Sequence, residues 1–402
     1  MTHKQRMRHV LDGEPTDRIP WCPRLDLWYN ANRRAGTLPA SYRNASLIEL
    51  TDGLGFAFHA IVPDFKNLRS PADEIHRALG VYNLDGMPYQ TRFENADVSA
   101  EQRGDESVVE YRTPHGLLRT RTLHDEAMRR AGITISHITE HAFKSPQDYK
   151  AIAHLFDNAV VEPNEAGYRR YADKIGERGF AAGFISLAGS PMHLILRELM
   201  PFDTFCYEMF DHPEELAVCA EAIGRYLLRV LKVAAESSAE VFLFGANYDV
   251  TLTNPVFFRQ HIQPWLRTFA DALHARGKYL LTHTDGENSG LLDSYMESGV
   301  DIADSVCPMP MTQLSLKDVR THFNGRISIM GGVPSVCLVK EAMPDADFPR
   351  FLDDFFADLG RGDHLILGVS DTTPPTADLD RLLEIARRIE EFGPVRPLEK
   401  TV

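Results

Sequence analysis

Six short apolar runs, each followed by a helix-like stretch, occupy the chain from about residue 145 to its end. The stretches 213–233 and 255–276 have the length and the apolar spacing of helices that pack on one side. Short apolar strands that alternate with helices are typical of parallel βα units, because helices cover the faces of a parallel sheet. The six predicted strands are 180–185, 241–244, 279–282, 302–306, 327–330 and 364–367.

Two further strand candidates precede residue 80. One is the segment 17–23, which has proline near its margins, and the other is 56–62, which ends at Pro63 and Asp64. Eight strands that alternate with helices are what a (β/α)8 TIM barrel requires, so we predict an α/β fold of this class. The alternative is an open doubly wound sheet, but no GxGxxG motif follows the first strand to support its dinucleotide-binding form.

Residues 80–143 have a different, β-rich character. Several segments alternate between polar and apolar residues or are rich in β-formers, and His115-Gly116 lies between two of them as a turn. We therefore predict a single domain over 1–402, with an antiparallel β meander inserted at 80–143. The expected strands of the meander are 89–93, 107–112, 117–122 and 133–138.

Composition excludes several classes of protein. The chain has 402 residues and a net charge of −14, which argues against nonspecific binding to nucleic acid or to anionic membranes. It has no apolar run near the roughly 20 residues of a membrane span, and the basic start leads into no apolar core of a signal peptide. The five cysteines are scattered and form no CxxC, so we expect a soluble cytoplasmic protein with reduced thiols.

The tetrapeptide His283-Thr284-Asp285-Gly286 directly follows the predicted strand 279–282. Side chains at positions i and i+2 point the same way while the chain stays extended, so His283 and Asp285 can act together. A metal ion or an acid–base pair would use that geometry. The alternative is structural: a hydrogen-bonded histidine, and an aspartate that opens a turn.

Other potential metal ligands follow neighbouring strands. Cys307 comes directly after 302–306, Asp371 follows the last strand, and Glu287 lies just beyond Asp285. The carboxyl ends of barrel strands meet at one face, and zinc accepts nitrogen, oxygen and sulfur ligands. We therefore predict a zinc site formed by His283 and Asp285 with Cys307 or Asp371. For Cys307, the alternative role is that of a small buried hydrophobic residue.

Arg24, Asp26 and Trp28 follow the first strand candidate. An arginine in a barrel mouth can bind a carboxylate or phosphate through two parallel hydrogen bonds, so these residues are predicted to bind substrate. An internal Arg24–Asp26 ion pair is the competing interpretation, and Trp28 is either an aromatic wall or part of the core.

Asn247, Tyr248 and Asp249 place an amide, a phenol and a carboxylate after the strand 241–244. We predict that they take part in catalysis, with Asp249 as the general acid or base, because a partly buried carboxylate can have its pKa moved toward neutrality. The alternative for Asp249 is an Asx turn that leads to Asn254-Pro255.

Taken together, these residues resemble the uroporphyrinogen decarboxylase superfamily, which includes zinc- and corrinoid-dependent methyltransferases. The resemblance covers most of the chain and implies its barrel fold. The motifs that carry it are Asp17-Arg18-Ile19-Pro20, Ser145-Pro146-Gln147-Asp148-Tyr149, His283-Thr284-Asp285-Gly286, Gly331-Gly332-Val333 and Gly368-Val369-Ser370-Asp371-Thr372-Thr373-Pro374-Pro375.

Two departures from the family patterns limit what the resemblance implies. Uroporphyrinogen decarboxylases carry Arg-Gln-Ala-Gly-Arg after the first strand, where this chain has Arg24-Leu25-Asp26-Leu27-Trp28-Tyr29, which argues against decarboxylation in the haem pathway. The methyltransferases bind zinc through a His-x-Cys pair and a later Cys. Here the pair is His283-Thr284-Asp285 and the later position falls near Ser370-Asp371, so the ion would be harder and more Lewis-acidic.

Three functions follow as hypotheses. The first is a metal-dependent methyltransferase that moves a methyl group between a small molecule and a corrinoid, or a similar carrier, on a separate protein. The second is a metal-free decarboxylase or lyase in which Arg24 binds a substrate carboxylate and Asp249 or Asp26 directs protonation. The third is a barrel that binds a small molecule without turnover, against which the density of titratable groups at the strand ends argues. A homodimer is what the resemblance implies.

Overall fold

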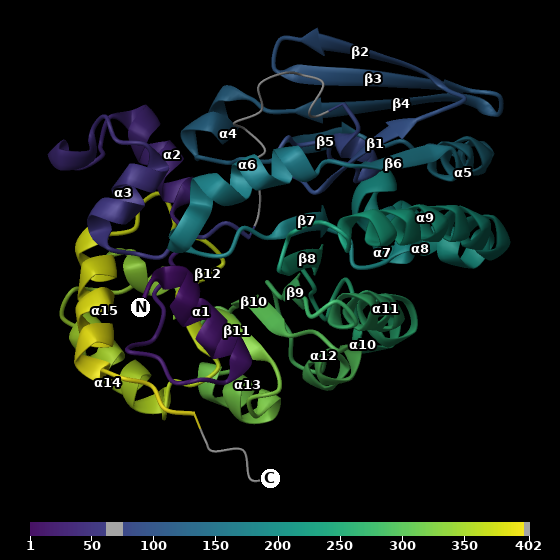
Figure 1. Cartoon of the computed structure of the whole chain (residues 1–402). Helices are drawn as coiled ribbons and strands as arrows, with labels where there is room; N and C mark the ends of the chain where they lie inside the picture. The colour runs from purple at the N-terminus through teal and green to yellow at the C-terminus, as the bar shows by residue number, and fades with distance from the viewer. Residues whose placement is uncertain (62–74, 398–402) are drawn as a thin grey trace.

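The structure, a computed structural model, describes residues 1–61 and 75–397. Its centre is a parallel sheet of six strands in the order β12-β11-β10-β9-β8-β7, with helices around it (Figure 1). Nearly every residue of these strands is buried, as expected for strands covered by helices. The strands are β7 (Gly183–Ser186), β8 (Val241–Ala246), β9 (Tyr279–His283), β10 (Ile302–Val306), β11 (Ser328–Pro334) and β12 (Leu365–Ser370).

All six strands predicted after residue 145 are thus confirmed, and neighbours in the sheet follow one another along the chain. The parallel register aligns Asp304 of β10 with His283 of β9, and Ser370 of β12 with Pro334 of β11. The carboxyl ends of the strands therefore lie along the same edge of the sheet.

The two earlier strand candidates do not form strands among the described residues. Trp21 makes an isolated parallel bridge with Leu367 of β12, and Ala60 makes one with Ala181, just before β7. The backbone N–H of Ala57 donates to the carbonyl of Trp21 at 2.9 Å. Single bridges of this kind connect both edges of the sheet to 20–22 and 56–60.

Proline explains why the first of these segments has no ladder. Pro20 and Pro23 lack the backbone N–H that a continuous ladder requires. A closed eight-stranded barrel therefore remains a prediction. Val62, Pro63 and Asp64, where the second strand was expected to end, lie outside the described residues.

Helices follow the strands and begin and end at recognisable caps. For example, α1 begins after a capping box at Thr2 and ends at Gly13, whose φ is 69°. Among the described residues, no helix combines the length and the apolar character needed to cross a membrane. The α-helices are α1 (His3–Asp12), α2 (Asp26–Ala35), α3 (Leu47–Leu54), α4 (Glu126–Arg130), α5 (Tyr149–Asp157), α6 (Glu165–Ile175), α7 (Pro191–Leu194), α8 (Phe202–Asp211), α9 (Pro213–Ala234), α10 (Pro255–Phe257), α11 (Gln263–His274), α12 (Leu292–Ser298), α13 (Leu316–Phe323), α14 (Phe348–Asp358) and α15 (Leu379–Phe392).

Two of these helices continue into π-helical turns. The turn η6 (Ile195–Leu199) follows α7, and η7 (Phe258–Ile262) joins α10 to α11. Such turns occur frequently at functional sites. The 3₁₀ turns are η1 (Ala40–Tyr42), η3 (Arg77–Leu79), η4 (Pro146–Asp148), η5 (Gly176–Arg178) and η8 (Ser335–Leu338).

The β-rich segment forms a four-stranded antiparallel sheet in the order β2-β3-β4-β5, seen at the top of Figure 1. Its strands are β2 (Asp97–Arg103), β3 (Glu106–Thr113), β4 (Gly116–Leu123) and β5 (His137–Glu140). Strand β2 was not predicted, because every one of its residues is exposed and neither face is buried.

One strand was assigned to the wrong sheet. We expected 89–93 in the meander, but this strand, β1 (Tyr89–Phe93), pairs antiparallel with β6 (Ala159–Pro163) in a separate two-stranded sheet. Buried Tyr89 explains the position, since its hydroxyl donates to the carbonyl of Ile185 in β7 at 2.6 Å. A contact between residues 96 positions apart is not visible in the local pattern.

A glycine is required where β8 leads into the site. Gly245 has φ +83°, and a Cβ there would lie 1.8 Å from the hydroxyl of Tyr248 and 2.9 Å from the Cα of Gly189. An L-residue with positive φ is strained by about 1–2 kcal/mol even without a clash. Only glycine therefore allows the turn that precedes Asn247.

We predict that Gly245→Ala lowers the free energy of unfolding by more than about 4 kcal/mol or prevents folding, because strain and a backbone clash act together. Gly277→Ala is the matched control: its φ is +66°, but an added Cβ would meet nothing within 4 Å, so strain alone should cost about 1–2 kcal/mol. Urea unfolding measures both, and equal losses would show that the close packing at Gly245 does not matter.

Candidate active site

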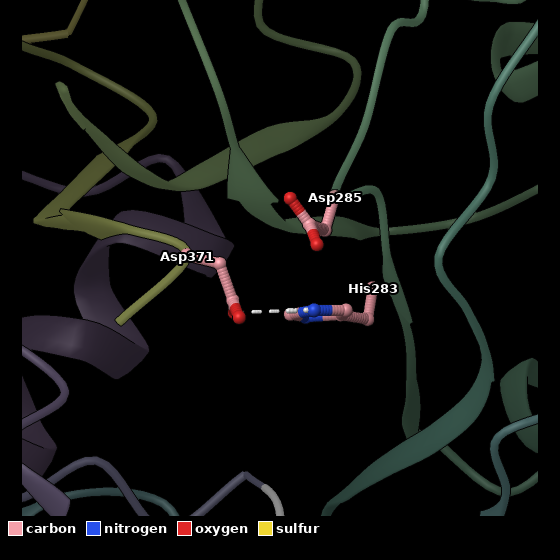
Figure 2. Close-up of side chains that lie close together, drawn as sticks. All are labelled: His283, Asp285 and Asp371. Carbon is pink, nitrogen blue, oxygen red and sulfur yellow. Dashed lines mark ion pairs between the residues drawn. The ribbon is translucent and has the colours of Figure 1, made fainter. Parts of the chain in front are cut away.

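The carboxyl ends of β9, β10 and β12 bring an imidazole and two carboxylates together. Nδ1 of His283 lies 2.7 Å from Oδ2 of Asp304. Its Nε2 lies 3.2 Å from Oδ1 of Asp371, the ion pair marked in Figure 2. The side chains of His283 and Asp304 are buried, at 6% and 2% exposure, whereas that of Asp371 is 29% exposed. Both nitrogens of the imidazole are therefore fixed, and Nε2 faces the carboxylate of Asp371, which is the more exposed of the two.

The electrostatics of this group favour charged forms. Burial alone would disfavour a protonated imidazole, but the carboxylates of Asp371 and Asp304 raise the pKa of His283 to about 10. Burial likewise opposes the charge on Asp304, yet hydrogen bonds from His283 and His59 hold the pKa of Asp304 well below its usual range. Arg24 and His283 lower the pKa of Asp371 in the same way, against the effect of burial.

Asp285 completes a possible metal site. One ligand atom each from His283, Asp285 and Asp371 lies within 4.8 Å of the others, and Figure 2 shows the three side chains facing a shared space. Imidazole nitrogen and carboxylate oxygen are zinc ligands, and such ligands must lose their protons when a metal binds. Asp304 on Nδ1 matches the carboxylate that commonly orients a metal-bound histidine. The donor set thus fits a divalent ion.

Cys307 lies beside this cluster rather than in it. Its Sγ donates to Oδ1 of Asp285 at 3.2 Å and contacts the carbonyl of Ser305 at 3.3 Å. Burial and the neighbouring Asp285 carboxylate raise the pKa of the Cys307 thiol, so the thiol is protonated in this arrangement. Three of the four predicted metal ligands are brought together, and a ligand role for Cys307 remains a prediction.

Arg24 forms the internal ion pairs that were the alternative to substrate binding. Its Nε lies 3.1 Å from Oδ1 of Asp26, and its Nη1 lies 3.2 Å from Oδ1 of Asp371. Asp26 begins α2 rather than continuing a strand. Trp28 is 4% exposed, and its Nε1 donates to the carbonyl of Ala377 at 3.0 Å, so its side chain belongs to the core and not to an aromatic wall.

The three predicted catalytic residues after β8 differ in position. Asn247 reaches the cluster, because its Nδ2 donates to Oδ2 of Asp285 at 3.1 Å. Tyr248 is completely buried, and its hydroxyl lies 2.9 Å from Oγ1 of Thr282.

Asp249 takes the alternative role that its sequence context allowed. Its Oδ1 accepts the N–H of Thr251 at 2.8 Å in an Asx turn, and its Oδ2 accepts the N–H of Glu287 at 3.1 Å. These donors outweigh burial and lower the pKa of Asp249. The expectation of a pKa moved toward neutrality was therefore wrong, because backbone N–H groups stabilise the ionised form.

Three further residues belong to the site and were not predicted from the sequence. Asp304 lies inside the predicted strand 302–306, where a charged residue in an apolar run is a usable signal. His59, in the segment 56–62, places its Nε2 3.4 Å from Oδ1 of Asp304. Arg197, in η6, donates from Nη1 to Oδ1 of Asn247 at 3.2 Å, and no local pattern indicates that contact.

The fold and the site together define the class of protein: a parallel α/β protein with a polar cluster at the carboxyl ends of its strands. The model of one protein family, described as uroporphyrinogen decarboxylase (URO-D), matches residues 120–391. Because this match covers more than half of the chain, the chain belongs to the uroporphyrinogen decarboxylase family. The resemblance noted in the sequence is confirmed.

Comparison with solved structures supports the fold. A methyltransferase from Methanosarcina mazei is similar over 98% of this chain and 99% of its own, with a TM-score of 0.50 and 15% sequence identity. At that identity the likeness concerns the fold alone. No curated protein matches the chain.

The raised pKa of His283 predicts a pH effect in protein freed of metal by a chelator. A histidine whose folded pKa of about 10 exceeds the unfolded value near 6.5 stabilises the fold fully below pH 6.5 and loses this contribution as pH rises to 10. Between pH 7 and 10, the unfolding free energy of the wild type should therefore fall by up to about 1.4 kcal/mol per pH unit more than that of His283→Gln. Parallel profiles for the two proteins would contradict the assigned protonation.

Proposed function

We propose that this chain is a metal-dependent methyltransferase that moves a methyl group between a small molecule and a corrinoid, or similar carrier, on a separate protein. The observation that carries the proposal is the convergence of His283, Asp285 and Asp371, with Asp304 behind the imidazole. Membership of the uroporphyrinogen decarboxylase family and the fold likeness to a methyltransferase support it. The proposal includes a closed eight-stranded barrel over the whole chain, with residues 80–143 as its insertion.

In this proposal His283, Asp285 and Asp371 hold the ion, with Zn²⁺ as the first candidate. When bound, such an ion acts as a Lewis acid that activates an oxygen or sulfur atom of the substrate. The chain prepares the ligands: Asp304 orients the imidazole and Arg24 orients the carboxylate of Asp371. Arg24 also balances the negative charge that two carboxylates bring to the site.

The metal-free decarboxylase or lyase has less support. It needed a free Arg24 to bind a substrate carboxylate, but that guanidinium already pairs with Asp26 and Asp371. It also needed Asp249 or Asp26 to direct protonation. The lowered pKa of Asp249 opposes an acid role at neutral pH, and Asp26 already pairs with Arg24.

We predict that purified wild-type protein carries about one equivalent of a divalent ion and that His283→Ala removes most of it, because the only nitrogen ligand is lost. His274→Ala is the matched control: His274 pairs with Asp301 at 2.8 Å, and its side chain is 41% exposed. Elemental analysis by mass spectrometry measures the metal. A wild type without metal, or His283→Ala with unchanged metal, would contradict the proposed site.

The reaction itself is testable with free methylcobalamin and a panel of small thiols. The wild type should accelerate demethylation of methylcobalamin, followed by its visible absorption, whereas His283→Ala or added chelator should lower the rate at least about 100-fold. Activity that persists at full rate with chelator would contradict metal dependence. Release of CO₂ from a carboxylated substrate by the metal-free protein would instead favour the decarboxylase.

A further inference from the structure

Asp285 lies on the chain after β9 ends, so its orientation depends on contacts from other segments. Oδ2 of Asp285 accepts from Nδ2 of Asn247 at 3.1 Å, and Oδ1 accepts from Sγ of Cys307 at 3.2 Å. A carboxylate held at both oxygens presents its remaining lone pairs in a defined direction. Asn247 is therefore one of two groups that set how Asp285 faces His283 and Asp371.

The backbone of Asn247 is itself attached to the end of β9. Its N–H donates to the carbonyl of His283 at 3.0 Å, and its φ is +58°, in the left-handed region that asparagine tolerates better than most residues. The side-chain amide has two different ends, an oxygen that accepts and a nitrogen that donates.

Arg197 determines which end of that amide faces the site. A guanidinium is only a donor, so the atom that Nη1 of Arg197 contacts at 3.2 Å must be Oδ1 of Asn247. The NH₂ group is then left to face the carboxylate of Asp285. The same Nη1 donates to the carbonyl of Ala246 at 3.2 Å, which ties Arg197 to the end of β8 as well.

An ion pair with buried Glu198 holds the guanidinium of Arg197 in place. Its Nε lies 3.1 Å from Oε1 of Glu198, and the other oxygen of Glu198 accepts from Nη1 of Arg77 at 2.7 Å. Glu198 is 3% exposed and Arg77 is 9% exposed. A continuous set of polar contacts thus runs from Arg77 in η3, through the π-helical turn η6, to Asp285.

We propose that Arg197 is a positioning residue: it fixes the amide of Asn247, and through that amide it fixes Asp285 in the proposed metal site. The inference rests on that proposed site. The side chain of Arg197 contacts Glu198, Ala246 and Asn247 and not the three proposed metal ligands, so it acts through Asn247. Groups that orient a metal ligand commonly contribute about 10–100-fold to metal affinity.

The test is a double-mutant cycle on Zn²⁺ affinity, measured by competition with a chromophoric chelator. Arg197→Met keeps most of the side-chain length and removes the donors, and Asn247→Gly removes the amide while allowing the positive φ. Each single variant should weaken Zn²⁺ binding about 10–100-fold, and the double variant should be no weaker than Asn247→Gly alone. Arg178→Met is the matched control and should bind Zn²⁺ like the wild type. Within the described ranges, the side chain of Arg178 pairs with surface residue Asp52 and with backbone carbonyls only.

The thermal midpoint of the metal-free variants separates positioning from general stability. Loss of stability in Arg197→Met with unchanged Zn²⁺ affinity would overturn the inference, as would losses of affinity that simply add in the double variant. If Arg197→Met does not fold, Arg197→Lys enters the same cycle, because lysine keeps the charge beside Glu198 and loses the planar fork. A wild type that binds no metal would overturn the proposed function itself. If the wild type binds Zn²⁺ and Arg197→Met binds it equally tightly, only this inference would be overturned.

Discussion

The imidazole of His283, buried between the carboxylates of Asp304 and Asp371, is the interaction on which the site depends. A charged group removed from water is tolerated only when it is paired and hydrogen-bonded. Here the parallel register of β9 and β10 supplies Asp304, and the end of β12 supplies Asp371. Arg24 then compensates the charge of Asp371, and the ring of His59 contacts Asp304. Both residues come from segments near the start of the described chain. The polar contacts of the site therefore follow from the strand order.

Much of the fold could be predicted because buried parallel strands leave a local signal. The run at 241–244 is continuously apolar, the run at 302–306 is apolar apart from Asp304 and Ser305, and both became strands. The segment 89–93 shows the limit: its residues indicated a strand, but its partner β6 depends on contacts that are distant in sequence. Strand β2 is exposed at every residue and is apolar only at Val98 and Ala100, so it gave too weak a local signal to be predicted.

The candidate site was predictable to a similar degree. Strand ends pointed to His283, Asp285 and Asp371, because residues at the carboxyl ends of parallel strands converge whatever the details of the loops. The pKa of Asp249 was not predictable, since it depends on backbone N–H groups of Thr251 and Glu287. Nor could sequence indicate that Arg24 is already paired, or that Arg197 reaches Asn247 across 50 residues.

The proposed function depends on which side chains would hold the ion. Where related methyltransferases are expected to use thiolates, this chain offers carboxylates. The thiol of Cys307 donates to Asp285 instead of replacing it. An ion held by oxygen and nitrogen is harder and more Lewis-acidic than one held by sulfur.

A crystal structure of the protein with Co²⁺ or Zn²⁺, with the ion located by its anomalous scattering, tests the central claim most directly. We predict a single strong anomalous peak at about 2.0–2.2 Å from Nε2 of His283 and from a carboxylate oxygen of both Asp285 and Asp371. No peak at this position, with the His283–Asp371 ion pair intact, would contradict the claim that this cluster is a metal site.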